Sequence, residues 1–168
     1  MRGWRATLAG VMTAVLVAGA AVAEPAGAQE AKPDFSGTWV LDLARSNPGP
    51  LPAPESLQVV IDHKDPAITS TLTQKAADDV ATSRTVITTD GQENRNTVST
   101  PDGEVTLISR SRWSGRTLIT ATSTTVQGTP IGVTESWSLS ADGKEMVVSR
   151  AFSSDQGAFQ QKFVFTRR

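Results

Sequence analysis

The chain has 168 residues, with 16 lysines and arginines, 17 aspartates and glutamates, and no cysteine. Its formal net charge of −1 argues against a nucleic-acid-binding protein, which would be expected to have a basic face. Without cysteine there are no disulfide bonds and no thiol chemistry, so packing and hydrogen bonds must stabilise the fold.

Residues 1–23 have the pattern of a secretory signal peptide. Arg2 and Arg5 precede an uncharged apolar run, 8–22, and 21–23 (Ala-Val-Ala) places small residues at the two positions that a signal peptidase reads. A second small-residue site allows cleavage after residue 28 instead. The run of roughly fifteen residues is shorter than the ~20 of a membrane anchor, and no cysteine follows it for a lipid anchor. We therefore expect an exported protein, periplasmic or secreted, that does not span a membrane after cleavage. Loss of Arg2 and Arg5 leaves 14 basic residues against 17 acidic, a charge of about −3.

Residues 24–33, rich in Ala, Gly, Pro and charge, predict a flexible lead into a single domain, 34–168. The first predicted strand is 34–43, where Gly37 and Trp39 share one face. A glycine weakens a strand unless another group must approach closely, so Gly37 beside Trp39 suggests a tightly packed barrel end.

The proline-rich stretch 46–54 predicts a stiff connection that crosses or covers something. Two strands follow, 57–63 and 68–74, and 75–80 is expected to be a loop or a single helical turn. From there, Gly-containing turn signals recur about every dozen residues, as in an antiparallel meander. The segments between them are dense in Thr, Val, Ile, Ser and aromatics and predict seven more strands: 81–89, 92–100, 104–113, 116–126, 131–140, 144–152 and 158–167.

This pattern predicts an all-β fold, an antiparallel up-and-down β-barrel of about 8–10 strands. Closing the sheet is the simplest way for one domain of this size to protect its edge strands. The absence of tyrosine and the polar outer faces argue against a transmembrane barrel, which would have an apolar outer band and aromatic girdles.

Gly37-Thr38-Trp39, the meander behind it and the basic end Arg167-Arg168 resemble the lipocalin and fatty-acid-binding-protein group of calycin barrels. The resemblance implies that the tryptophan closes one barrel end and that Arg167 packs across it. The runs 34–46, 61–66 and 137–144 also resemble exported bacterial lipocalin-like proteins of unassigned function. The Thr-Asp-Tyr signature of classical lipocalins is absent. Eight strands would fit lipocalins and ten the fatty-acid-binding type.

The candidate binding residues are polar side chains on otherwise apolar strand faces. Glu135, Arg150 and Gln161 each lie in such a row, and Arg84 is a further candidate on a face with Thr82 and Val86. Buried charges are expected to pair with each other or with a ligand. One hypothesis is that Arg150, with Arg84 as a second candidate, binds the acidic head of an amphiphile in an apolar cavity lined by Trp137, Met146, Phe159 and Phe163.

Two alternatives to this hypothesis remain open from the sequence. Glu135 and Arg150 could form an internal ion pair, or a one-residue shift in register could place one or both outside. His63 is the only histidine, and without cysteine partners it makes a poor metal ligand, so no metal and no cofactor is expected.

The leading functional hypothesis is an exported barrel that binds a small hydrophobic or amphiphilic ligand. The alternative is a structural or interaction protein of the cell envelope with a filled barrel and no small-molecule ligand. An enzyme is less expected, because the sequence contains no phosphate-binding loop, zinc-protease motif or nucleophile elbow. The oligomeric state is not predicted.

Overall fold

The computed structural model describes residues 31–76, 79–100 and 103–168; the predicted signal peptide and residues 24–30 of the predicted lead lie outside the described residues. The ten strands are β1 (Gly37–Leu41), β2 (Ser56–Lys64), β3 (Ala67–Ala76), β4 (Asp79–Thr88), β5 (Asp90–Thr100), β6 (Gly103–Ser114), β7 (Thr117–Val126), β8 (Thr129–Leu139), β9 (Glu145–Ser154) and β10 (Gly157–Arg167). One turn of 3₁₀ helix, η1 (Leu43–Arg45), follows β1.

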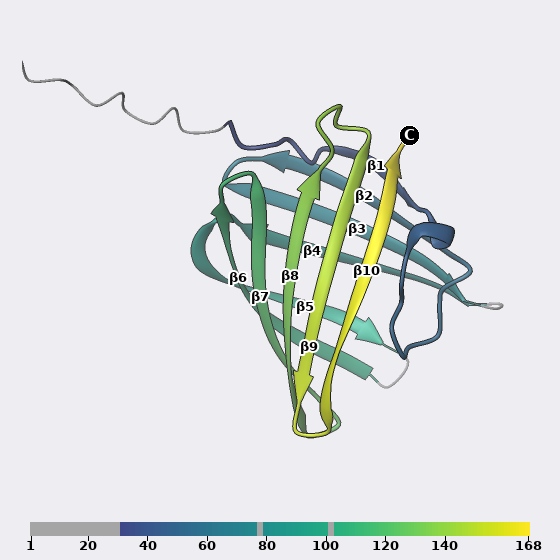
Figure 1. Cartoon of the computed structure of the whole chain (residues 1–168). Helices are drawn as coiled ribbons and strands as arrows, with labels where there is room; N and C mark the ends of the chain where they lie inside the picture. The colour runs from purple at the N-terminus through teal and green to yellow at the C-terminus, as the bar shows by residue number, and fades with distance from the viewer. Residues whose placement is uncertain (1–30, 77–78, 101–102) are drawn as a thin grey trace, which may run out of the picture.

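All ten strands belong to one antiparallel sheet in the order β4-β3-β2-β1-β10-β9-β8-β7-β6-β5. The sheet curls into a barrel in which the strands in front, β7 to β10, cross those behind (Figure 1). The all-β antiparallel barrel predicted from the sequence is confirmed, and its strand number is ten rather than eight.

The barrel is nearly closed at a seam between β4 and β5, which are neighbours without a backbone ladder. The side-chain amide of Asn96 on β5 spans this seam. Its Oδ1 accepts a hydrogen bond from the Val86 N–H at 2.7 Å, and its Nδ2 donates to the Val86 carbonyl at 2.9 Å. One asparagine therefore supplies the paired hydrogen bonds that a neighbouring strand would otherwise make.

Most predicted strand bounds differ from the structure by one or two residues, and two predictions need a larger correction. The first strand is shorter than 34–43, because the Asp42 carboxylate accepts a hydrogen bond from the Arg45 N–H and turns the chain into η1. The expected loop or helical turn over 75–80 is wrong at both ends, since β3 continues to Ala76 and β4 begins at Asp79, while 77–78 lie outside the described residues. Both strands are extended by cross-strand pairing, which local sequence does not reveal.

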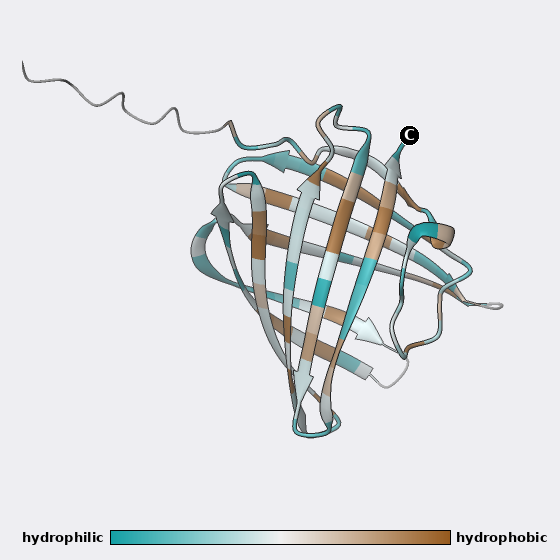
Figure 2. Cartoon of the chain, in the orientation of Figure 1, coloured by the Kyte–Doolittle hydropathy of each residue, from teal (hydrophilic) through white to brown (hydrophobic). Residues whose placement is uncertain are grey.

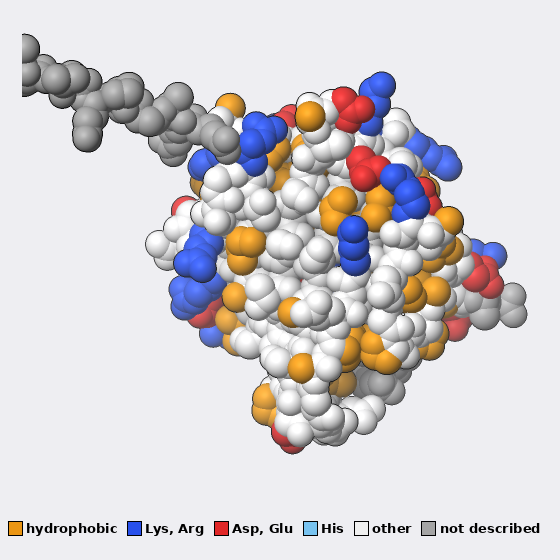
Figure 3. Space-filling model, viewed as in Figure 1, with side chains coloured by type: hydrophobic (Ala, Val, Ile, Leu, Met, Phe, Trp, Pro, Cys, Tyr) orange, Lys and Arg blue, Asp and Glu red, His pale blue; other side chains and the backbone are white. Residues whose placement is uncertain are grey.

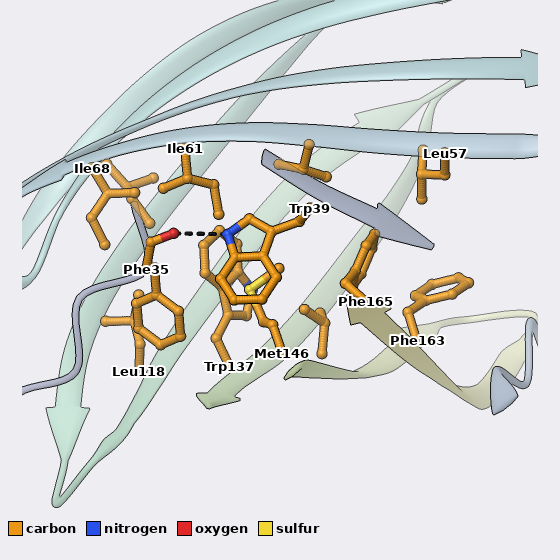
Figure 4. Packing of buried hydrophobic residues seen from close by; sticks show 13 residues of the cluster. Phe35, Trp39, Leu57, Ile61, Ile68, Leu118, Trp137, Met146, Phe163 and Phe165 are labelled. Carbon is orange, nitrogen blue, oxygen red and sulfur yellow. Dashed lines mark hydrogen bonds between the residues drawn. The ribbon is translucent and has the colours of Figure 1, made fainter. Parts of the chain in front are cut away.

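The core follows the two-residue alternation of the strands, visible as brown and paler bands on several of them in Figure 2. Its most buried members include Phe35, Trp39, Ile68, Leu118 and Met146. Trp39 Nε1 donates a hydrogen bond to the Phe35 carbonyl at 2.8 Å, drawn as the dashed line in Figure 4. The segment before β1 is thereby packed into the barrel instead of lying on its surface.

Arg167 and Gly37 lie against Trp39 at this end of the barrel. The Arg167 guanidinium carbon is 4.6 Å from the Trp39 ring centroid, and its Nη2 donates to the Asp34 carbonyl at 3.1 Å. Gly37 has a φ of 133°, a conformation that residues with a side chain rarely adopt. The glycine thus lets the chain turn into β1 directly beside the arginine.

A cluster of aromatic rings lies under the same end. Phe35 stacks on Trp113 with centroids 5.9 Å apart, and His63 stacks on Trp113 at 6.0 Å. Asp65 lies at the edge of this cluster and accepts hydrogen bonds from Thr89 Oγ1 at 2.6 Å and from Trp113 Nε1 at 3.1 Å. We call the barrel end formed by Trp39, Arg167 and this aromatic cluster the closed end. In the part of the chain that the structure describes, no helix has the length and apolar character needed to cross a membrane.

Candidate functional site

The barrel interior contains a cavity of about 380 Å³ that is partly open to solvent and is lined by residues from β2 to β10. It exists because several inward positions of the strands hold small side chains. Ser70, Ser83 and Ser109 occupy places where leucine or isoleucine would fill the interior. Phe35 and Trp39, two of the largest fully buried side chains, pack at the closed end and do not line the cavity.

Glu135 and Arg150 form an ion pair on the cavity wall. They lie directly opposite each other in the β8–β9 register, so both side chains leave the sheet on the same face. The Glu135 side chain is 17% exposed and that of Arg150 30%. Trp137 Nε1 donates to the second Glu135 oxygen at 3.3 Å, and the Arg150 guanidinium carbon is 5.3 Å from the Phe163 ring centroid. The internal ion pair that the sequence left open is therefore present.

The structure brings most of the predicted binding residues to the interior of the barrel. Glu135, Trp137, Met146 and Arg150 line the cavity. Phe163 is buried beside Arg150, as described above.

The other two predicted residues on β10 have different neighbours. Phe159 stacks on Phe152, a cavity-lining residue, at 4.6 Å. Gln161 is buried, but its Nε2 donates to the Pro48 carbonyl at 2.7 Å, so it is engaged with the proline-rich segment.

Arg84 does not join these residues, and its expected inward position is corrected. It lies on the exposed outer row of β4, opposite Thr71. The inward row of β4 is fixed by pairing with β3, where Thr85 lies opposite Ser70. The sequence suggested an inward position because Val86 shares a strand face with Arg84. Val86 itself faces outward at the seam and is exposed.

Sequence reasoning missed the hydroxyl groups that line the cavity. Ser70, Ser83, Thr85, Ser109 and Thr122 all face it. In the sequence alone, serine and threonine are typical of exposed strand faces. Because β4 and β7 carry hydroxyl side chains on both faces, no alternation in the sequence separates the inward set from the outward one.

His63 lies at the closed end and does not line the cavity. Its Nδ1 accepts a hydrogen bond from the Phe35 N–H at 3.2 Å, which anchors the segment before β1. The structure thus gives the histidine a position in the packing of the barrel end. Among the described residues, no group of three or more His, Cys, Asp or Glu side chains could hold a metal ion.

Neither a protein-family model nor a curated protein matches the sequence. The structure is similar to that of a mutant of the fluorescent protein UnaG, with a TM-score of 0.51 and 13% identity over 79% of this chain and 95% of that one. A zebrafish ileal bile acid-binding protein complexed with cholic acid aligns with a TM-score of 0.49 and 16% identity, over 80% of this chain and 98% of that one.

The ten-stranded, nearly closed antiparallel barrel is a lipocalin-like, or calycin, fold of the fatty-acid-binding-protein type. At this level of identity, the similarity defines the fold alone.

Proposed function

We propose that this protein is an exported barrel that binds one small hydrophobic or amphiphilic molecule in its interior. The observation that carries the proposal is the cavity of about 380 Å³. Small-molecule sites commonly measure ~300–1,000 Å³ and combine apolar walls with a few polar groups. Export is supported by the signal-peptide pattern of residues 1–23.

The composition of the wall supports a hydrophobic or amphiphilic ligand. Trp137, Met146, Phe152 and Phe165 contribute large apolar surfaces to the cavity. Moving hydrocarbon from water to such a surface is favourable by about 25 cal/mol per Å². A ligand with polar groups could also use the ion pair and hydroxyls on the same wall.

The alternative, a filled barrel that acts as a structural or interaction protein, has less support. A broad exposed apolar patch would be its signature. Hydrophobic side chains on the face seen in Figure 3 lie in several separate groups. Val60 and Val86 are exposed, but the register places Thr71 opposite Val60 and Thr69 opposite Val86, so β3 separates them.

The first test is whether the interior takes up a neutral probe. We expect Nile red, an uncharged dye whose emission rises in apolar surroundings, to bind the chain 24–168 saturably with one site per molecule. Ser83→Leu places a larger side chain in the cavity and should weaken this binding at least tenfold. Thr82→Leu, on the exposed face of the same strand, is the matched control and should leave binding unchanged.

Native mass spectrometry of protein isolated from its own compartment tests the same proposal without a chosen probe. A stoichiometric small molecule released on unfolding would support ligand binding. Folded wild-type protein with neither a co-purifying molecule nor saturable Nile red binding would favour the filled scaffold.

A further inference from the structure

The hydroxyl groups of the cavity wall are confined to one group of strands. On β8 to β10, apart from the Glu135–Arg150 pair, every described lining residue is apolar: Val133, Trp137, Met146, Val148, Phe152 and Phe165. Trp137, Met146 and Phe165 are labelled in Figure 4. This wall offers hydrocarbon and aromatic surface with one ion pair.

The hydroxyl groups all come from the other side, strands β3, β4, β6 and β7. Apolar side chains lie among them on this side of the cavity: Val59, Leu72, Ile87, Val98 and Leu107. They form two cross-strand sets: Ser70 lies opposite Thr85 with Ser83 two residues along, and Ser109 lies opposite Thr122. Together with Thr120, these residues carry the hydroxyl groups among the described lining residues, and we call the six of them the polar wall.

Most of this polar wall has no hydrogen-bond partner within the protein. Thr120 Oγ1 donates to Ser111 Oγ at 2.9 Å. In the described part of the chain, no hydrogen bond uses the side-chain oxygens of the other five, although Ser70 is 9% exposed and Ser109 4%. These five oxygens are accessible from the cavity, since His63 Nε2 is the one fully buried side-chain nitrogen or oxygen atom without a partner among the described residues. Polar groups inside proteins nearly always have a partner, in the protein or in water. These hydroxyls therefore have hydrogen-bonding capacity that only a molecule in the cavity, ligand or water, can use.

The cavity has no net charge to offer a ligand. Glu135 and Arg150 are the two charged residues among the described ones that line it, and they are paired with each other. An anionic group that approached Arg150 would also lie beside the Glu135 carboxylate. It would lose its hydration and meet a like charge at the same position. A neutral carbonyl or hydroxyl could use the remaining Arg150 N–H groups without that penalty.

We infer that the ligand is an uncharged molecule with hydroxyl or carbonyl groups along one side and hydrocarbon along the other. Its polar side lies against the serine and threonine wall of β3 to β7, and its apolar side lies against β8 to β10. This inference rests on the proposed function, since it specifies the ligand class of the same cavity. It differs from the hypothesis, drawn from the sequence, that Arg150 binds the acidic head of an amphiphile.

Three steroid probes separate the two parts of this inference. Cholamide is uncharged and has three hydroxyls on one face; lithocholamide is its uncharged counterpart with one hydroxyl; cholate has the three hydroxyls and a carboxylate. We expect competition against Nile red at neutral pH to rank cholamide at least tenfold tighter than either of the others. Each missing hydrogen bond weakens binding by about two- to tenfold.

Paired variants assign the effect to the polar wall. Thr85→Val with Thr122→Val removes two cavity hydroxyls with little change in shape, and should weaken cholamide about tenfold while leaving lithocholamide unchanged. Thr82→Val with Thr125→Val changes the exposed faces of the same two strands and should alter neither.

The outcomes separate the two proposals. If Nile red and all three steroids fail to bind and no small molecule co-purifies, the proposed function itself is wrong. If Nile red binds but cholate is as tight as cholamide or tighter, the ligand is not uncharged. Equal affinity of cholamide and lithocholamide, or equal effects of the inward and outward threonine variants, would refute the polar wall as the recognition surface.

Discussion

Glu135 and Arg150 each depend on the other, because both charges sit on the wall of an interior cavity. Arg150→Met leaves the carboxylate with only Trp137 as a hydrogen-bond donor. We expect it to lower the free energy of unfolding by about 2 kcal/mol. The double variant Glu135→Gln with Arg150→Met removes both charges and should recover most of that loss.

Urea denaturation at neutral pH, analysed as a double-mutant cycle, measures this coupling. Losses that simply add in the double variant would mean that the two side chains act independently. That result would contradict a paired, uncharged cavity wall.

Asp65 makes the stability of the closed end depend on pH. Its hydrogen bond from Thr89, followed by its contacts with Lys32 and Trp113, lowers the pKa of this carboxyl to about 2. A depressed pKa stabilises the folded state above the ordinary pKa and loses that effect as pH falls toward the folded value. The contribution should therefore disappear between about pH 4 and pH 2. Because the side chain is 39% exposed, solvent screening limits it to about 1 kcal/mol.

Asp65→Asn tests this contribution. We expect the stability difference between wild type and this variant to shrink by about 1 kcal/mol as the pH is lowered through that window. Asp62→Asn, three residues earlier and exposed, is the control. A wild-type advantage over Asp65→Asn that stays constant from neutral pH to about pH 2 would show that the carboxylate charge is not what stabilises the closed end.

At the scale of elements, β1 pairs with only the last part of β10, and the proline-rich connection pairs with β10 just before that part. Asn47 and Lys162 exchange both backbone hydrogen bonds, at 2.7 and 2.9 Å. Gly49 follows with a φ of 65°, so close that a Cβ would lie 2.7 Å from the Gln160 carbonyl oxygen. The segment is thus fitted to β10 over several residues, and Gln161 adds its bond to Pro48.

Gln161→Leu removes that last bond and leaves the Pro48 carbonyl without its partner. We expect a loss of about 1 kcal/mol in unfolding free energy and faster proteolytic cleavage near Leu51. Gln160→Leu, on the exposed face of β10, should change neither. Identical cleavage rates for the two variants would mean that the side chain of Gln161 does not hold the segment in place.

The elements were predictable wherever the signal was local. Turn residues such as Asp142-Gly143 separate the strands, and alternation along β8 and β9 placed Glu135 and Arg150 in the interior rows. The row of Arg84 was misassigned because β4 mixes small, hydroxyl and apolar residues on both faces. Its orientation depends on its register with β3, a contact that no local pattern encodes.

The seam and the polar wall were beyond sequence reasoning for a related physical reason. Asn96 reads as an ordinary polar strand residue until β5 is placed beside Val86. The pairing of Ser70 with Thr85, and of Ser109 with Thr122, likewise appears only when the strands are in register. The interior positions of Glu135 and Arg150 follow from the alternation within each of their own strands, whereas these features depend on the register between strands.

At the scale of the whole molecule, the seam divides the chain into two consecutive meanders. Strands β1 to β4 form one and β5 to β10 the other, and the β1–β10 ladder joins them on the opposite side of the barrel. Across the seam itself, the covalent link is the short turn through Thr89 (Figure 1).

Cutting the chain at that turn would break no backbone ladder, so the barrel could be divided there into two fragments that keep all of their strand pairings. The two fragments would have to find each other through β1, β10 and the shared core. Ser83 and Thr85 come from the first fragment, Trp137 and Arg150 from the second, and neither alone carries a complete cavity. Binding of a dye by the mixed fragments would then report that they have associated. The seam is therefore a site at which the chain can be divided so that a complete cavity forms only when both fragments are present.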